Sequence, residues 1–254
     1  MKKLFVSSTF KDMQLERDSL KKHIVPNLNM RLREYGTKIS QTDLRWGIST
    51  TELNAEESEQ KILNVCLDEI NKSRPYMIVM IGERYGWIPS PAIIEMNARG
   101  RDIELSSNEI SVTQLEIEYI AFTERWDESR IFFYFRDLDT SQMDDATREI
   151  YAPESSRARE RLDALKTRIK NKFPSQIRHY TLEYKDGEIR GIEGFERLVT
   201  EDLYSLFKRD LETDEKTDVN IRVREKLHKE ALERFDVYSP YYDVSRDIMN
   251  LGAT

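Results

Sequence analysis

The 254-residue chain contains little cysteine, histidine, glycine or proline. Its single cysteine, Cys66, cannot form an internal disulfide, which excludes a small disulfide-stabilised secreted scaffold. The three histidines lie far apart in the sequence, so they give no zinc-binding spacing. Nine glycines and seven prolines are too few for a turn-rich all-β fold or a low-complexity chain.

Long apolar runs and an excess of positive charge are also missing. No apolar stretch approaches the roughly 20 residues of a membrane-spanning helix. The N-terminus reaches the polar residues Ser7, Ser8 and Thr9 without the apolar stretch of a signal peptide. The net charge of −7 disfavours non-specific nucleic-acid binding. We therefore expect a cytoplasmic protein that binds neither membranes nor nucleic acid directly.

What the chain does contain is an alternation of apolar strands and amphipathic helices. Its 10 Phe, 12 Tyr and 3 Trp provide enough aromatic surface for a core. The order predicts an α/β fold with a five-stranded parallel sheet and helices on both faces, a flavodoxin-like three-layer sandwich. The predicted strands cover residues 4–6, 38–44, 76–81, 131–135 and 179–184; the predicted helices cover 12–34, 55–73, 111–124, 157–172, 195–211 and 219–235.

Two features divide this pattern. Pro26 falls inside the first predicted helix, where we expect a kink or a break. Residues 88–110 contain several turn-forming residues and are expected to be an inserted loop. We expect one domain over residues 1–212 and a helical extension or linker over residues 213–254.

Polar and aromatic side chains follow the predicted strands at their carboxyl ends, where parallel α/β sheets bind ligands. Hydroxyl groups suit ribose or phosphate oxygens, arginine suits phosphate, and aromatic rings stack on flat bases. These strand ends therefore predict a nucleotide-sized pocket. Turn formation, core packing and a structural ion pair between Glu83 and Arg84 are the alternative roles. The candidate ligand-binding residues are Ser7, Ser8, Thr9, Phe10, Arg45, Trp46, Arg84 and Tyr85, with Asp43, Trp87, Arg136 and Asp137 at the same strand ends.

The predicted helix over residues 111–124 carries a carboxylate at the border of its apolar face. Glu116 lies roughly 60° from the centre of that face, whereas Glu118 lies roughly 100° away, towards solvent. A carboxylate at such a border is costly unless it is used or paired. Glu116 is therefore the catalytic candidate, with an ion pair or a helix-terminus charge as the alternative. Ser111 and Gln114 fit a capping box at the start of this helix.

Several nucleotide-binding and hydrolase motifs are absent from the sequence. There is no GxxxxGK[ST], no GxGxxG after the first strand and no GxSxG. Cys66 lies on the apolar stripe of the helix over residues 55–73, so we expect it to be an inert core residue.

Four ordered blocks of sequence within roughly residues 4–122 together resemble a known family. They are residues 5–13 (FVSSTFKDM) with 16–18 (ERD), 43–48 (DLRWGI), 66–70 (CLDEI) through 82–87 (GERYGW), and 111–118 (SVTQLEIE). The pattern resembles a TIR-like family found at the N-terminus of NACHT-type STAND ATPases with TPR or WD repeats. Its members include telomerase-associated and nephrocystin-type proteins and bacterial immune relatives.

The resemblance implies a TIR-like fold and a function. Many TIR domains hydrolyse NAD⁺ with a glutamate on the helix after the third strand, and Glu116 matches that position. Such a carboxylate would stabilise the oxocarbenium-like ribose as the nicotinamide bond breaks. NAD⁺ would be the substrate, with no metal and no further cofactor. Under this hypothesis Ser7, Ser8, Thr9 and Phe10 contact the nucleotide, Arg45 and Arg84 hold its pyrophosphate, and Trp46 or Tyr85 stacks on a ring.

The resemblance also implies partners and leaves alternatives open. We expect covalently linked ATPase and sensor domains, and activation by self-association of TIR-like domains. Two other functions remain possible for the same sequence. One is a non-catalytic interaction module that nucleates assembly, and the other is a different nucleotide N-glycosidase, such as a nucleoside deoxyribosyltransferase-like enzyme.

Overall fold

The computed structural model describes residues 1–42, 54–122 and 127–214, together with Lys226 and Lys229. The chain divides into two compact units, Met1–Tyr204 and Ser205–Thr254. Residues 205–214 of the second unit are helical, whereas the predicted helix over 219–235 lies almost entirely outside the described residues. The sheet and the candidate site belong to the first unit.

The first unit is built on a six-stranded sheet with the strand order β2-β1-β3-β4-β5-β6. Five strands are parallel, and β6 runs antiparallel to β5. The mixed α/β class and the parallel arrangement are confirmed. The strands are β1 (Lys2–Ser8), β2 (Ile39–Thr42), β3 (Tyr76–Ile81), β4 (Ile131–Leu138), β5 (Ile177–Lys185) and β6 (Glu188–Arg190).

The predicted number of five strands is wrong, because β5 turns back into the short strand β6. The turn consists of Asp186 and Gly187, whose φ angles are 55° and 83°. Two residues with positive φ form the tight turn that suits the twist of a hairpin, and Asp-Gly is a favoured pair there. No strand was predicted after residue 184, so this turn was not predicted either.

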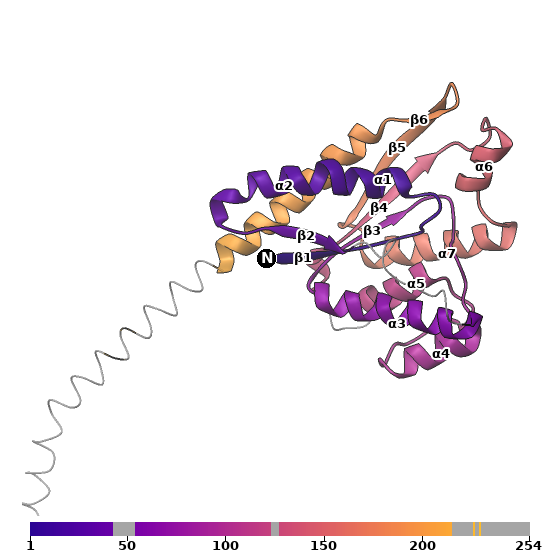
Figure 1. The fold of residues 1–254 in the computed structure, drawn as a ribbon, viewed down its shortest axis with the longest axis horizontal. Coiled ribbons are helices and arrows are strands. Elements are labelled where there is room, and N and C mark those ends of the chain that lie inside the picture. Colours follow the sequence, from indigo (N-terminus) through magenta and orange to yellow (C-terminus); the bar gives the residue numbers. More distant parts are fainter. Residues whose placement is uncertain (43–53, 123–126, 215–225, 227–228, 230–254) are drawn as a thin grey trace, which may run out of the picture. The chain divides into compact units, whose positions relative to one another are not determined.

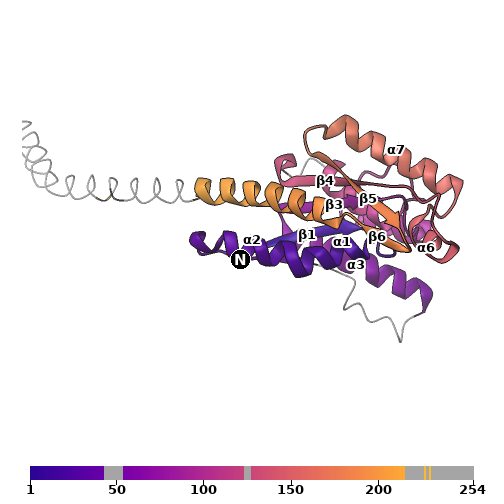
Figure 2. The same ribbon diagram turned by 90° about the horizontal axis from the view of Figure 1, so that it is seen from above.

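Helices cover both faces of the sheet (Figure 1). One face is covered by α3 (Ala55–Ser73), α5 (Val112–Ile117) and α7 (Ser156–Lys172), and α4 (Pro91–Arg99) packs against α3; their buried apolar residues form one cluster. The other face packs against α1 (Gln14–Ser19), α2 (Val25–Arg31) and a helix that begins at residue 192. On that face the ring of Phe195 lies 4.7 Å from that of Tyr180 and 5.9 Å from that of Tyr134. Seen from above, α3 and α7 lie apart from each other (Figure 2).

Burial on both faces explains the apolar strands. All six residues of β3 are buried, as expected for a central parallel strand. Alternate residues face opposite helical layers, so a continuous apolar run is needed rather than an alternating one. The bounds of α3 and β3 agree with the sequence-based prediction.

The predicted break in the first helix is confirmed: a π-helical turn at Leu20–Ile24 divides it just before Pro26, which lies at the start of α2, where its missing N–H is tolerated. Two other helical features differ from the prediction. The expected loop over residues 88–110 contains α4, whose Ile93 and Ile94 are buried. A short helix, α6 (Asp145–Tyr151), was not predicted; none of its residues is buried, so it has no apolar stripe to detect.

Within the part of the chain that the structure describes, no helix is long and apolar enough to cross a membrane.

A buried guanidinium fixes the carboxyl edge of the sheet. Arg136 of β4 is 1% exposed and pairs with Asp12 at 2.6 Å, Glu16 at 3.0 Å and Glu83 at 2.6 Å. Arg136 was expected at the strand ends that form the nucleotide pocket, but the structure uses it in this ion cluster. The alternative pairing of Glu83 with Arg84 is also wrong, because Glu83 pairs with Arg136 and Arg84 pairs with Glu154.

This cluster leaves no room for a side chain at Gly82. A Cβ atom there would overlap Arg136 Nη2 and lie 2.8 Å from Asp12 Oδ2. We predict that Gly82→Ala lowers the free energy of unfolding by about 2 kcal/mol or more, because overpacking would displace buried charges. Thermal or urea unfolding measures this change.

Gly194→Ala is the matched control, since a Cβ at Gly194 meets nothing within 4 Å. Because residue 194 lies in the first turn of a helix, the free energy of unfolding should stay the same or rise by up to about 1 kcal/mol. Equal stability of the two variants would contradict the tight packing at Gly82.

Candidate active site

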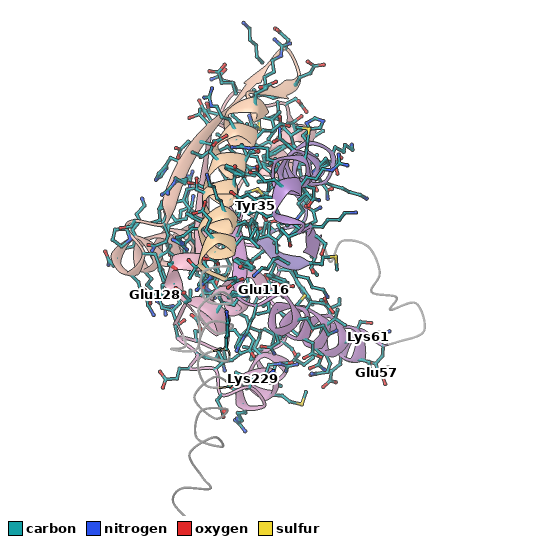
Figure 3. The ribbon with its side chains drawn as sticks, turned by 90° about the vertical axis from the view of Figure 1, so that its left-hand side faces the viewer. Tyr35, Glu57, Lys61, Glu116, Glu128 and Lys229 are labelled. Atoms are coloured by element: carbon teal, nitrogen blue, oxygen red, sulfur yellow. The ribbon has the colours of Figure 1, made fainter. Side chains whose placement is uncertain are left out.

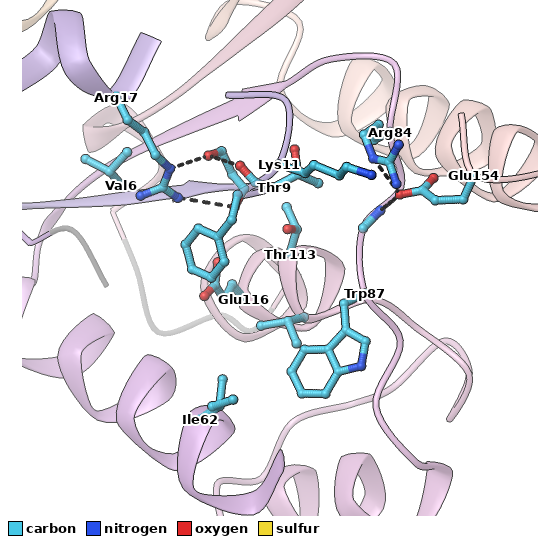
Figure 4. A pocket seen from close by; sticks show the side chains of 14 residues that line it. Val6, Thr9, Lys11, Arg17, Ile62, Arg84, Trp87, Thr113, Glu116 and Glu154 are labelled. Atoms are coloured by element: carbon cyan, nitrogen blue, oxygen red, sulfur yellow. Dashed lines mark hydrogen bonds and ion pairs between the residues drawn. The ribbon is translucent and has the colours of Figure 1, made fainter. Parts of the chain in front are cut away.

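A pocket of about 320 Å³ opens at the carboxyl end of β1 and β3 (Figure 4). The strand order reverses between these two strands, since β2 lies on one side of β1 and β3 on the other. Ligands of open α/β sheets bind at such a switch point. The pocket lies where the sequence predicted it. Its lining comes from β1 and the loop after it (Val6, Ser8, Thr9, Phe10, Lys11), from Arg17, Ile62 and Glu154, from the loop after β3 (Arg84, Gly86, Trp87) and from α5 (Val112, Thr113, Glu116).

Glu116 is the buried acid of this pocket. Its side chain lies inside the molecule, whereas Glu57 and Lys61 of α3 point outward (Figure 3). The hydroxyl of Ser7 donates a hydrogen bond of 2.5 Å to Glu116 Oε2. Glu116, predicted at the border of the apolar face of its helix, is thus buried. Ser7 lies behind the pocket wall and supports the acid rather than facing a ligand.

Burial raises the pKa of Glu116 to about 7, because a low-dielectric surrounding disfavours the charged form. Three groups oppose this effect and favour the carboxylate. They are the hydrogen bond from Ser7, the charge of Arg17 and a hydrogen bond from Cys66. Near neutral pH the carboxyl group is therefore divided between its two protonation states, as acid–base and electrostatic catalysts often are.

Cys66 is buried, as predicted, but it is not isolated. Burial raises the pKa of its thiol, with a further contribution from nearby Glu116. The thiol therefore stays protonated and acts as a donor to the carboxylate.

The start of α5 forms half of the predicted capping box. Ser111 Oγ accepts a hydrogen bond of 3.2 Å from the main-chain N–H of Gln114. The side chain of Gln114 does not return to the cap. It accepts a hydrogen bond of 2.6 Å from the hydroxyl of Tyr85 and donates one of 2.8 Å to Glu118.

The predicted exposure of Glu118 is wrong. Its side chain is fully buried and accepts hydrogen bonds from Arg168 at 2.7 Å and from Ser106. The reason is that α7 and the segment before α5 cover the side of α5 that the helical phase alone assigns to solvent. Glu118 thus serves as a structural anion, two residues from Glu116.

Arg17 is a pocket residue that the sequence analysis missed. Its Nε donates to Ser8 Oγ at 2.8 Å, and its Nη2 donates to the carbonyl oxygen of Ser8 at 3.2 Å. The Phe10 ring centroid lies 4.9 Å from the guanidinium. Arg17 lies on the same face as the buried residues Met13 and Leu20, so the helical-phase argument used for Glu116 would also have found it.

The structure brings most of the predicted ligand-binding residues together, but not all. Ser8, Thr9, Phe10 and Arg84 line the pocket with Glu116. Tyr85 does not line it, since its ring is 2% exposed and belongs to the core. The exposed indole of Trp87 lines the pocket in its place. Arg45 and Trp46, like Asp43, lie outside the described residues.

Three further lining residues were not predicted to contact the ligand. Lys11 and Thr113 are ordinary polar residues of a loop and a helix, and Glu154 lies 68 residues after Gly86, to which it is bound. Among the described residues, no group of three or more His, Cys, Asp or Glu side chains is placed to hold a metal ion.

The fold and the pocket define an α/β domain with a ligand-sized site at the switch point of its sheet. The chain belongs to the family described as "Domain of unknown function (DUF4062)", whose model matches residues 3–188. No solved structure gives a significant match.

Relatives of the chain are much longer proteins, some of them named for TPR or WD repeats. The chain is 33% identical over 190 residues to a TPR repeat-containing protein of Dictyostelium discoideum, with 68% of this chain and 11% of that protein covered. It is 31% identical over 219 residues to Telomerase protein component 1 of Mus musculus, with 82% of this chain and 8% of that protein covered. It is 27% identical over 108 residues to NACHT domain- and WD repeat-containing protein 1 of Mus musculus, with 37% and 7% covered.

The chain thus spans about a tenth of the length of these relatives. The expected similarity to NACHT and repeat proteins is confirmed, and the TIR-like part of that resemblance stays a prediction.

The raised pKa of Glu116 predicts a pH-dependent stability. The folded state binds the proton of Glu116 more tightly than the unfolded state does. Protonated Glu116 therefore adds to the stability of the fold below pH 4.5, and this stabilisation is lost as the pH rises through about 7. The loss is about 3 kcal/mol. Glu116→Gln should therefore melt at a higher temperature than the wild type at pH 8, with a smaller difference at pH 5. Melting curves over this range measure the difference.

Glu118→Gln is a matched control, because it removes a second buried carboxylate of the same helix that is already paired with Arg168. It should lower the melting temperature at both pH values. A difference between Glu116→Gln and wild type that does not change with pH would contradict the assigned pKa.

Proposed function

We propose that this domain hydrolyses NAD⁺ at the bond between nicotinamide and ribose, with Glu116 as the catalytic carboxylate. The observation that carries the proposal is a buried carboxyl group in the wall of a pocket at the switch point of the sheet, where burial raises its pKa to about 7. The order β2-β1-β3-β4-β5 supports it, because flavodoxin-like folds have this order. The resemblance of four sequence blocks to TIR-like domains supports the same reaction.

The reaction needs a carboxylate at this place. As the glycosidic bond breaks, its electron pair leaves with the nicotinamide nitrogen, and positive charge moves from the pyridinium ring to the ribose. An ionised Glu116 beside the ribose stabilises that charge, and the buried surroundings strengthen the attraction. Water then adds its oxygen to the ribose carbon and loses a proton to solvent. The products are ADP-ribose, nicotinamide and a proton.

The pocket suits half of a dinucleotide. Its volume of about 320 Å³ is at the lower end of the range of about 300–1,000 Å³ for ligand sites. The nicotinamide riboside part would therefore occupy it, with the rest of the molecule outside. Trp87, which is 44% exposed, offers an indole ring for stacking on nicotinamide.

We propose that the domain acts as an effector of a longer STAND-type immune or signalling protein. The relatives support this, since their names give TPR repeats, a NACHT domain and WD repeats. In this account a linked ATPase domain gathers several copies, and self-association of the TIR-like domains switches hydrolysis on.

The same surface supports a second candidate function. Phe10, Trp87 and Ile88 are all exposed, and the first two line the pocket. Exposed apolar side chains are typical of interaction sites. A non-catalytic module that binds a partner or a second copy there would need no reactive acid.

Nicotinamide release from NAD⁺ separates these functions. We predict turnover by wild-type protein at high concentration or after forced oligomerisation, and a loss of at least about 100-fold in Glu116→Gln. Because the ionised carboxylate is needed, the rate should rise with pH through about 7. Chromatography of the products measures both.

Glu118→Gln serves as the control in this assay, since Glu118 contacts α7 and not the pocket. Its rate per folded molecule should stay close to that of wild type. Absence of nicotinamide release under every assembled condition would contradict the proposed hydrolase and favour the interaction module.

A further inference from the structure

The carboxylate of Glu154 is held in the way that proteins hold a bound anion. Its two oxygens accept hydrogen bonds from consecutive main-chain N–H groups, those of Tyr85 at 3.1 Å and Gly86 at 3.0 Å. One of these oxygens also pairs with Arg84 Nε at 3.1 Å. Glu154 comes from the loop between α6 and α7, whereas all three of its partners belong to the loop after β3. Figure 4 shows Arg84 and Glu154 together at one side of the pocket, with Lys11 reaching towards them.

The loop after β3 is shaped to aim two N–H groups at one point. Gly86 has a φ of 97°, a conformation that L side chains rarely adopt. A Cβ at Gly86 would also come within 3.0 Å of Thr9 Cγ2. Successive N–H groups in such a turn form a concave site for anions. The backbone therefore provides the donors whichever anion is bound.

Arg84 is oriented for the same position before any ligand arrives. Its Nη1 donates to the carbonyl oxygens of Glu149 at 2.9 Å and Ala152 at 3.0 Å, at the end of α6. These contacts fix the guanidinium with its Nε edge towards the carboxylate of Glu154. A donor that is already oriented loses little entropy when it binds.

The charges around this position balance only while Glu154 is there. Lys11 lines the same part of the pocket and pairs with Glu149 at 2.9 Å. Two cations, Lys11 and Arg84, thus face two carboxylates. Glu154 can leave without a change in the fold, because its side chain is 28% exposed and can turn into water, but its carboxylate then loses these three contacts. Its departure gives the site a net positive charge and two vacant N–H donors.

We propose that Arg84 and the N–H groups of Tyr85 and Gly86 form a binding site for a diphosphate, which Glu154 occupies until the ligand displaces it. The inference extends the proposed function, since the diphosphate of a dinucleotide follows the ribose that lies beside Glu116. The location fits this order: Lys11, Arg84 and Glu154 line both the pocket that holds Glu116 and a neighbouring hollow of about 560 Å³. Glu154 thereby gates entry of the substrate.

Binding of inorganic pyrophosphate to the whole chain tests the inference without turnover. We expect Glu154→Ala to bind pyrophosphate at least tenfold tighter than wild type by calorimetry. Glu149→Ala is the matched control, because it removes the same charge next to Lys11 but leaves the N–H groups of Tyr85 and Gly86 occupied by Glu154. It should bind within threefold of wild type. The double variant Arg84→Ala/Glu154→Ala should lose the gain. Binding by Glu154→Ala that is no tighter than binding by Glu149→Ala would overturn the proposal.

Amide resonances show which residues the ligand contacts, and they also show whether a variant is folded. Pyrophosphate should shift the ¹⁵N–¹H signals of Tyr85 and Gly86 in wild type, and at lower concentration in Glu154→Gln, which removes only the charge. Unchanged signals at both residues in folded protein would also overturn the proposal. These results are independent of nicotinamide release. If the protein hydrolyses NAD⁺ but pyrophosphate binding does not depend on Glu154, only the diphosphate site is refuted. If pyrophosphate binding depends on Glu154 but NAD⁺ is not hydrolysed, only the proposed reaction is refuted.

Discussion

The buried guanidinium of Arg136 is the interaction on which the candidate site depends. It joins β4 to Asp12 and Glu16 after β1 and to Glu83 after β3, so it fixes the carboxyl ends of three neighbouring strands. Asp12 in turn accepts a hydrogen bond of 2.5 Å from Thr9, which lines the pocket. Buried ion pairs add little net stability, because desolvation offsets their attraction, but removal of one partner leaves costly unpaired charges. The cluster therefore specifies the geometry of this edge more than it stabilises the fold.

Three acidic residues close to this edge show how the surroundings decide the role of a carboxyl group. Glu118 is buried but paired with Arg168, which makes it structural. Glu154 is partly exposed and bound to main-chain N–H groups and Arg84. Glu116 is buried at the pocket wall, where the groups that favour its charged form do not offset the effect of burial, and its pKa is raised to about 7. Glu116 combines access to the pocket with a pKa raised towards neutral pH, which suits a catalytic acid or base.

Periodicity alone predicted much of the fold, because buried strands and amphipathic helices follow from local patterns. It located α3 and β3 and placed Glu116 at the border of a buried face. It failed where a distant element decides the outcome. Glu118 is buried because α7 covers it, and Tyr85 packs in the core, where Gln114 of α5 accepts its hydroxyl hydrogen bond. Glu154 reaches the pocket from a loop that no local pattern connects with β3.

Titration of the Glu116 side-chain carboxyl carbon by ¹³C NMR tests the central claim most directly, with Glu116→Gln used to assign the signal. The account predicts a midpoint near pH 7 in the free protein. It also predicts a clear downward shift when NAD⁺ is added, because a cationic nicotinamide riboside in the pocket favours the carboxylate. A midpoint near 4.5, or one that NAD⁺ leaves unchanged, would contradict the assignment of Glu116 as the acid of a nucleotide site.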